Sequence, residues 1–337
     1  MLYRLAILGT LVVAGIVAAP SANAWGPDGH QTVGKLADGI LVGTNAQKEV
    51  KKILGSMKLE RAALWADCAK GVTPDKQGTF AYRGAGHFKE CAPFETKAEE
   101  AKMVAFVQRN WTNCSPRPDQ EVCHKQFHYT DVAIQRGQYG VTAGTSSHDV
   151  VGAIKVAIGV LQGNAAPADV KITSKREALL LLAHYVGDIH QPLHVTAVYL
   201  SDQGQLVDPD QQGLDIKTET VGGNSILITG TNLHHSWDEV PQELGPSQLG
   251  ASAVEEARAT PVTTGDVSTW SATWATDTIS VGVHPAFDNV SYAPEDAHKH
   301  WQGTLPSGYS AARVALQRQQ LLKAGGHLAQ LLQAIWP

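Results

Sequence analysis

Two histidine–aspartate pairs with helical spacing are the first residues of this chain that could do chemistry. His184 and Asp188 stand four residues apart in AHYVGDIHQPLH, and His234 and Asp238 repeat that spacing in NLHHSWD. Residues four apart on a helix share a face, so each pair presents an imidazole and a carboxylate together. These are ligands that zinc favours. Taken alone, the first pair could equally be a hydrogen-bonded contact that orders the core.

Further candidate ligands are spread along the chain. His194 follows the first pair in QPLH, where Pro192 ends the helix and the chain turns back. Asp67 lies in LWADCAK near the end of a helical stretch, and His128 lies in FHYTD. Each of these residues has an ordinary structural explanation, but the whole set favours a metal centre.

The first 24 residues are predicted to be a cleaved secretory signal. Arg4 supplies the positive charge, LAILGTLVVAGIVAA is apolar but short for a membrane span, and Ala22-Asn23-Ala24 is an A-x-A cleavage site. The mature chain would then begin at Trp25 with a free α-amino group. That nitrogen and the Trp25 carbonyl oxygen could chelate a metal, with His30 turned toward the same ion. The alternative is a tryptophan that follows the cleavage site by chance.

The composition is that of an exported globular protein. Four cysteines suggest two disulfides, and although three connectivities are possible, we expect neighbours to pair, Cys68 with Cys91 and Cys114 with Cys123. Residues 25–337 are expected to form one domain, because no repeat, charge block or linker divides them. The chain has 32 acidic and 27 basic residues, which by itself argues against a polyanionic substrate.

The hydrophobic pattern predicts a mainly α-helical fold. The clearest helix begins at Ser174, which has capping-box spacing to Glu177, and ends before Pro192. It is apolar nearly all round, which predicts a central, buried position. Segment 215–230 is predicted to form a β-hairpin turning at Gly222-Gly223-Asn224, and 201–214 a polar loop. The other predicted helices are 30–42, 45–54, 60–68, 97–110, 148–162, 265–280 and 309–335.

Together these motifs resemble the zinc-dependent single-strand-specific nucleases, the type I family of nuclease S-one and P-one. WGPDGH, WAD, HYTD, HYVGDIHQPLH, VGGN and NLHHSWD follow the family's order through most of the mature chain. The resemblance implies the mainly α, single-domain fold shared with zinc-dependent phospholipase C, with three zinc ions in a cleft. Five histidines, three aspartates and the N-terminus would be the ligands. The implied sets are Asp67, His128, His184 and Asp188; Trp25 and His30, with Asp188 bridging; and His194, His234 and Asp238.

Two histidines compete for the position after Asp67 in the family's order. His128 stands in His-Tyr-Thr-Asp before the helix predicted at 148–162, as the family pattern requires, whereas His87 in GHFKE lacks the aspartate and comes early. We therefore assign His128, which makes 83–123 an insertion held by disulfides. Surface or packing roles are assigned to His190, His235, His284, His298, His300 and His327.

The implied reaction is hydrolysis of a phosphodiester bond to a 5′-phosphate product. Zinc lowers the pKa of a bound water and binds phosphate oxygens as a Lewis acid. Asp67, Asp188 and Lys70 are assigned as catalytic residues. Lys70 replaces an arginine that is frequent in the family, which keeps the charge but loses the two-pronged phosphate contact. Three zinc ions and three aspartates would give the cleft a charge of about +3, so the acidic composition does not exclude nucleic acid.

Three residues are implied to bind the substrate base. Tyr129 matches the family's stacking aromatic residue, Val221 in VGGN matches the apolar wall opposite, and Asp131 matches a carboxylate that accepts hydrogen bonds from the base. Stacking requires an unpaired base, which predicts a preference for single-stranded DNA and RNA. The alternative for Tyr129 is a packing role in the core.

Two other functions remain open. A zinc-dependent phospholipase C shares the fold, but typically ends its ligand set with glutamate and lacks the base pocket, so Asp238, Tyr129 and Asp131 favour a nuclease. A non-enzymatic zinc-binding protein would close each site with four ligands, whereas the set ending at Asp238 has three. We expect a secreted or periplasmic monomer that acts on single-stranded nucleic acid and nucleotides, without stable membrane association and with possible 3′-nucleotidase activity.

Overall fold

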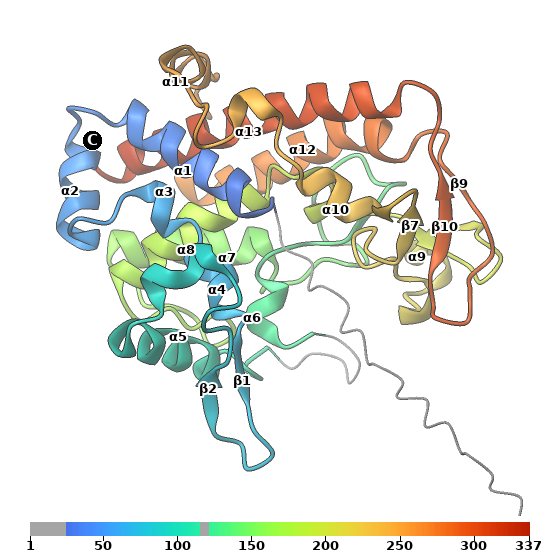
Figure 1. Cartoon of the computed structure of the whole chain (residues 1–337), viewed down its shortest axis with the longest axis horizontal. Coiled ribbons are helices and arrows are strands. Elements are labelled where there is room, and N and C mark those ends of the chain that lie inside the picture. Colours follow the sequence, from blue (N-terminus) through green and yellow to red (C-terminus); the bar gives the residue numbers. More distant parts are fainter. Residues whose placement is uncertain (1–24, 115–120) are drawn as a thin grey trace, which may run out of the picture.

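The computed structural model describes residues 25–114 and 121–337 (Figure 1). The predicted signal, 1–24, lies outside the described residues. Helices dominate, as the sequence predicts, and the strands are short. The helices are α1 (Pro27–Ile40), α2 (Asn45–Leu54), α3 (Leu59–Ala62), α4 (Trp65–Ala69), α5 (Lys97–Arg109), α6 (Cys123–Gln126), α7 (Val150–Gln162), α8 (Lys175–Asp188), α9 (Pro209–Gln212), α10 (Leu233–Asp238), α11 (Ala251–Arg258), α12 (Trp270–Phe287) and α13 (Tyr309–Ile335).

Helix α8 lies at the centre, as its apolar sequence predicts. The Ser174 hydroxyl accepts a hydrogen bond from the backbone N–H of Glu177, which caps the first turn. Every residue from Glu177 to Asp188 is buried. Neighbouring helices cover it on several sides: α7 packs along it, and α1, α3, α4 and α13 also contact it. The polar residues at its C-terminal end are therefore held deep inside the protein.

The long C-terminal helix α13 packs against α1 in the layer that covers α8 (Figure 1). A Cβ atom at Gly325 would lie 2.5 Å from the Leu36 Cβ atom of α1, so the missing side chain lets the two helices approach closely. Helix α12 contacts both α7 and α13, and α11 rests on α1 and α13. This packing fixes the N-terminal end of α1, which carries His30, against α8.

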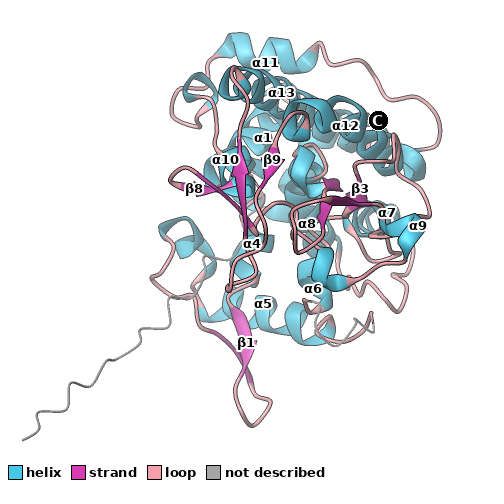
Figure 2. Cartoon of the chain, turned by 90° about the vertical axis from the view of Figure 1, so that its right-hand side faces the viewer, coloured by secondary structure: helices cyan, strands magenta, loops and turns pink. Residues whose placement is uncertain are grey.

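Within residues 25–114 and 121–337, the strands form four small sheets scattered among the helices (Figure 2). The largest has the order β8-β7-β10-β9, in which Ile226 of β7 pairs in parallel with Trp301 of β10. The hairpin β1–β2 projects from the end of the molecule that carries α5 (Figure 1). The strands are β1 (Val72–Pro74), β2 (Phe80–Tyr82), β3 (Val132–Ala133), β4 (Thr196–Ala197), β5 (Tyr199–Leu200), β6 (Leu206–Val207), β7 (Ile226–Ile228), β8 (Thr231–Asn232), β9 (Ser291–Tyr292) and β10 (Trp301–Thr304).

The hairpin predicted over 215–230 is wrong. Its proposed turn is part of a tight loop, because the carbonyl of Thr220 accepts hydrogen bonds from the N–H groups of Gly223 and Ser225. The hairpin that forms lies further on, with Leu227 of β7 pairing with Asn232 of β8. The predicted polar loop 201–214 is wrong in part, because it contains β6 and the short helix α9.

Two helix predictions also need correction. The helix predicted at 60–68 is split into α3 and α4, and the Ala63 carbonyl between them accepts a hydrogen bond from His184. The helix predicted from 265 begins only at Trp270, after a 3₁₀ turn that Asp266 caps. It continues to Phe287 even though it contains Pro285.

Both disulfides join the neighbours that we expected. Cys68 of α4 bonds to Cys91, and Cys114 bonds to Cys123 at the start of α6. The first bond links the helix that carries Asp67 to the 3₁₀ helix η1 (Lys89–Phe94). Among the described residues, no helix combines the length and apolar character needed to cross a membrane.

Candidate metal centre

Three clusters of histidine and aspartate side chains meet inside the fold. They come from α1, α4, α8 and α10, from the 3₁₀ helix η2 (Pro192–His194), and from the residues after α6. All eight side chains that the resemblance implies as ligands belong to these clusters, and within each one the ligand-type atoms lie within 4.8 Å of one another. The clusters are His30, His184 and Asp188; Asp67, His128 and His184; and His194, His234 and Asp238.

The third cluster contains two imidazoles whose inner nitrogens face each other. The Nδ1–H of His194 donates to the carbonyl of His128 over 2.8 Å, and the Nδ1–H of His234 donates to the carbonyl of Gly222 over 2.7 Å. Each neutral ring then has only a lone pair at Nε2, and these two Nε2 atoms lie 3.0 Å apart. Two facing acceptors repel unless a cation or a proton lies between them. Carbonyl contacts of this kind orient histidines that bind metals.

Asp238 completes the third cluster. Its Oδ2 atom lies 3.7 Å from Nε2 of His234, the residue one helical turn earlier on α10. Its Oδ1 atom accepts a hydrogen bond of 2.8 Å from the buried side-chain amide of Gln191. Nothing in the local sequence marks Gln191 as part of the site, although it lies inside the motif GDIHQPLH. It orients the Asp238 carboxylate and keeps one oxygen directed at the histidines.

His184 lies at the junction of the first two clusters. Its Nδ1–H donates to the Ala63 carbonyl over 2.6 Å, which leaves a lone pair at Nε2. That Nε2 atom lies 3.0 Å from Nδ1 of His128 and 3.3 Å from Oδ2 of Asp188. The spacing of His184 and Asp188 on α8 therefore directs both side chains to one point, and His184 belongs to two clusters rather than to one.

His30 enters from α1 and stacks on His184. Their ring centroids are 3.6 Å apart and the planes differ by 13°. The Nε2 atom of His30 lies 3.4 Å from Oδ1 of Asp188. Within the part of the chain that the structure describes, neither ring nitrogen of His30 has a hydrogen-bond partner. A buried histidine without hydrogen bonds is costly, so this position needs a ligand to satisfy it.

Burial sets the protonation of these side chains. It lowers the pKa of His30 to about 3, and the pKa values of His184 and His234 to about 4. It raises the pKa of Asp188 well above its usual range. The imidazoles are neutral, and burial disfavours the anionic form of the Asp188 carboxyl. This arrangement suits a divalent cation, because the cation supplies the missing positive charge.

Asp67 behaves differently because it has a cationic partner. Burial alone would raise its pKa, but the ammonium of Lys70 and the neighbouring His184 lower it below its usual range. The Nζ atom of Lys70 lies 2.7 Å from Oδ1 of Asp67, one helical turn away at the end of α4. Asp67 is therefore an ionised carboxylate at neutral pH. Lys70 adds positive charge at the edge of the second cluster.

Trp25 anchors the start of α1 beside the clusters. Its indole is fully buried, and its Nε1–H donates to the carbonyl of Gly187, directly before Asp188. The next residue, Gly26, donates its backbone N–H to the carbonyl of Asp238 over 3.1 Å. The backbone of Trp25 is thus fixed between the ends of α8 and α10, which carry ligands of the first and third clusters.

Tyr129, Asp131 and Val221, the implied substrate residues, line one cavity together with His128 and His194. The cavity has about 1290 Å³ of empty space, its open mouth included. Val221 is half exposed and has a φ of 54°, which is unusual for a β-branched residue. Tyr129 is partly buried, and burial raises the pKa of its hydroxyl well above the usual value.

Asp131 has an unusual environment in this cavity. Burial, together with the charges of Glu219 and Glu121, raises its pKa to about 8. Its Oδ1 atom is buried and has no hydrogen-bond partner among the described residues. The side chain is therefore protonated at neutral pH, and it can donate a hydrogen bond as well as accept one.

Other cavity residues were missed because nothing in the local sequence marks them. Lys125 and Glu121 contribute side chains from the α6 region, and His300 contributes one from the loop before β10. The rejected candidate His87 is exposed and lies outside the clusters. His190 and His327 form a buried pair with a 2.8 Å contact between ring nitrogens, in keeping with their assigned packing role.

Comparisons with known proteins identify the family of this chain. A model of the S1/P1 Nuclease family matches residues 25–337. Endonuclease 2 of Arabidopsis thaliana is 26% identical over 347 residues, covering 95% of this chain and 93% of that protein. Endonuclease 1 of the same plant is 23% identical over 347 residues, covering 98% and 92% respectively. The chain therefore belongs to the S1/P1 nuclease family, zinc-dependent enzymes with a phospholipase C-like fold that hydrolyse phosphodiester bonds.

Proposed function

We propose that the protein is an endonuclease specific for single-stranded DNA and RNA, that it holds three zinc ions, and that it releases 5′-phosphate products. Activity on nucleoside 3′-monophosphates is part of the proposal. The observation that carries it is the pair of facing Nε2 atoms of His194 and His234, 3.0 Å apart with both Nδ1 atoms engaged. A cation between these nitrogens removes the repulsion of their lone pairs.

The three clusters are the proposed zinc sites. The donor sets consist of neutral imidazoles and carboxylates, which is the chemistry that zinc prefers. The unpartnered nitrogens of His30 support the fit independently of the family. Removal of residues 1–24 would free the amino group of Trp25, which we propose as a further ligand beside His30. Bound zinc supplies Lewis acidity toward phosphate oxygens and lowers the pKa of a bound water.

The surrounding side chains bind and orient the substrate. Lys70 neutralises a phosphate oxygen while it remains paired with Asp67. Tyr129 and Val221, which line the same cavity, contact a base there, and Asp131 bonds to the edge of that base. A base that enters this cavity must leave its stack and its partner strand. Stacking on Tyr129 therefore supports a preference for single strands.

We also propose that the protein acts outside the cytoplasm as a monomer. The two disulfides support residence in an oxidising compartment, either the periplasm or the exterior. The family match begins at Trp25, the residue after the predicted cleavage site. A chain of 25–337 is proposed to be a single domain, with 83–123 as a disulfide-held insertion.

The experiment compares three substrates with the processed, zinc-loaded protein. A single-stranded oligonucleotide, the same sequence as a duplex, and phosphatidylcholine are incubated in parallel, and the ends of the products are identified by mass spectrometry. Faster cleavage of the single strand, with phosphate retained on the 5′ ends, supports the proposal. Turnover of the lipid alone would favour the phospholipase. Zinc binding without any phosphoester cleavage would favour a structural zinc protein.

A further inference from the structure

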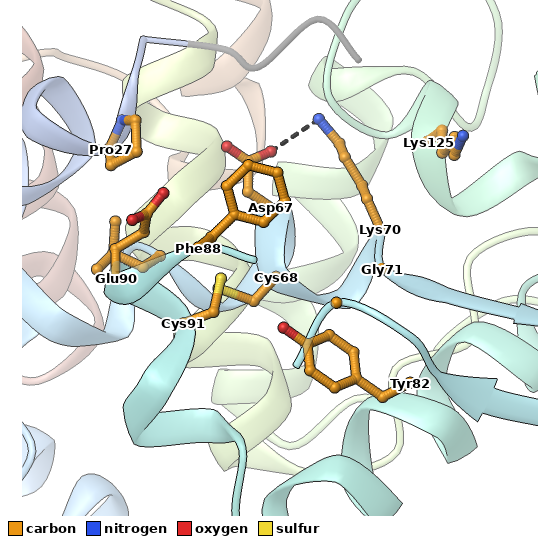
Figure 3. A pocket seen from close by; sticks show the side chains of 12 residues that line it. Pro27, Asp67, Cys68, Lys70, Gly71, Tyr82, Phe88, Glu90, Cys91 and Lys125 are labelled. Atoms are coloured by element: carbon orange, nitrogen blue, oxygen red, sulfur yellow. Dashed lines mark ion pairs between the residues drawn. A yellow bond between two sulfur atoms is a disulfide. The ribbon is translucent and has the colours of Figure 1, made fainter. Parts of the chain in front are cut away.

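A second hollow adjoins the metal centre, and the aromatic and disulfide-bonded residues of its wall have no role in the proposed function. It is lined by Asp67, Lys70, Phe88 and Glu90, together with the disulfide of Cys68, and has about 640 Å³ of empty space, its open mouth included (Figure 3). Lys70 and Lys125 line both this hollow and the cavity of Tyr129. We call it the insertion hollow, because residues 84, 88, 90 and 91 of its wall come from the predicted insertion.

The two hollows reach the metal centre through different ligands. The cavity of Tyr129 is lined by His128, His194 and His234, whereas the insertion hollow is lined by Asp67. The second cluster, which contains both Asp67 and His128, therefore borders both hollows, and Lys70 and Lys125 line both as well. A chain with a phosphate at the metal centre can extend into a hollow on either side.

The aromatic wall of the insertion hollow is held firmly in place. Phe88 directly precedes the 3₁₀ helix η1, and Cys91 of that helix is bonded to Cys68, the neighbour of Asp67. Below it, a Cβ atom at Gly71 would lie 2.8 Å from the ring of Tyr82, so this ring packs directly on the backbone that follows α4. Figure 3 shows the Phe88 ring above the disulfide and beside Asp67.

Phe88 is also unusually exposed for its type, at 47% of its surface. An exposed aromatic ring beside cationic side chains is the arrangement that proteins use to stack unpaired bases. Glu90 in the same wall disfavours a second phosphate there, but its carboxylate can accept hydrogen bonds from the amino group of a base. The chemistry of the hollow therefore suits a nucleobase rather than a phosphate.

We propose that the insertion hollow binds the nucleoside on the 3′ side of the scissile phosphate, with its base stacked on Phe88. This inference rests on the proposed nuclease function. In the proposed reaction, the nucleoside that carries the leaving 3′ oxygen lies in the cavity of Tyr129, beside His194 and His234. The nucleoside that keeps the 5′ phosphate must then leave in the other direction, past Lys70 into the insertion hollow.

The test compares two substrates that differ only on the 3′ side. Thymidylyl-(3′→5′)-thymidine has a nucleoside there, and thymidine 3′-monophosphate has none. For Phe88→Ala we expect kcat/KM to fall about tenfold on the dinucleotide and to stay unchanged on the mononucleotide, because one stacking partner is lost. Phe88→Trp should retain the activity of the parent enzyme. An equal change on both substrates, or none on either, would overturn the inference.

Calorimetry gives a readout that does not depend on turnover. The phosphorothioate form of the dinucleotide and thymidine 3′-monophosphate are titrated into the parent protein, into Phe88→Ala, and into the control Val141→Ala, whose side chain is exposed and lines neither hollow. We expect Phe88→Ala alone to weaken binding of the dinucleotide, by about tenfold. If the parent protein cleaves neither substrate, the proposed function is wrong. The binding constants then decide separately whether the insertion hollow binds the 3′ nucleoside.

Discussion

The Nε2 atoms of His194 and His234 face each other across 3.0 Å, although the two residues are 40 positions apart in the chain. Each ring is fixed by a carbonyl at its other nitrogen, so neither can turn away without losing a buried hydrogen bond. This arrangement holds an acceptor pair ready for a cation.

Replacing one member of this pair should remove one metal ion. For His194→Ala we expect bound zinc to fall by about one ion per chain and cleavage of single-stranded DNA to fall roughly 100-fold or more, because Lewis acidity at that position is lost. His235→Ala is the matched control, since His235 is exposed and adjacent to the other ligand. Elemental analysis and initial rates measure both effects. Full activity of His194→Ala with its zinc content intact would contradict the assignment.

Chelation should destabilise the protein as well as inactivate it. Without cations, both ring nitrogens of His30 and the Oδ1 atom of Asp188 are buried without a hydrogen-bond partner among the described residues. Because ligands that bind only the folded state stabilise it, we expect EDTA to lower the melting temperature by at least about 5 °C and added zinc to restore it. Differential scanning calorimetry measures the change. An unchanged melting temperature in the chelated, metal-free protein would count against a centre that binds several metal ions.

The helical spacing of the ligands could be predicted from sequence, because it is a local property. His184 and Asp188 on α8, and His234 and Asp238 on α10, lie on shared helix faces as i, i+4 pairs must. The burial of α8 could also be predicted from the sequence, because its surface is apolar nearly all round. Distances between ligands of different helices could not be predicted in this way. Only the resemblance to a family suggested that these elements meet.

Features that depend on distant pairing were missed or misplaced. Strand β7 pairs in parallel with β10, from residue 301, and no local pattern reports a partner so far along the chain. The Gly-Gly-Asn segment indicated a hairpin turn, but its backbone instead wraps around His234, whose Nδ1–H bonds to the Gly222 carbonyl. Phe88 and His300 line hollows only because the segments before η1 and β10 fold against elements that are distant in the sequence.

Asp131 should make stability depend on pH. Burial first, and then Glu219 and Glu121, raise its pKa from the ordinary 3.8 to about 8. Between about pH 4 and 8 the folded state therefore holds a proton that the unfolded state has lost, so this group lowers stability as pH rises. We expect Asp131→Asn to be more stable than the parent at pH 8 and about equal at pH 4. Asp202→Asn, at an exposed position, is the control in the same denaturation series. A stability gain that does not depend on pH would show that the carboxyl is ionised when folded.

Val221 combines backbone strain with a role in the cavity. A positive φ costs a β-branched residue of the order of 1 kcal/mol, which glycine avoids. Glycine also has more conformational entropy than valine in the unfolded chain, which offsets part of this gain. We therefore expect Val221→Gly to stabilise the fold by roughly 0.5–1 kcal/mol in total. Val221→Ala keeps the strain and should not stabilise the fold.

Both variants remove the apolar wall, so kcat/KM on mononucleotides should fall severalfold. Urea denaturation together with kinetics separates these effects, and full activity of both variants would exclude Val221 from base binding.

We propose that three divalent cations occupy the clusters formed by α1, α4, α8, α10 and their neighbours. An anomalous difference map, recorded on either side of the zinc absorption edge from crystals of the processed protein, locates each ion directly. We predict three peaks, one beside His30 and Asp188, one beside Asp67 and His128, and one between His194 and His234. A fully active enzyme whose map shows no zinc peak at these residues would show that the clusters are not its metal sites.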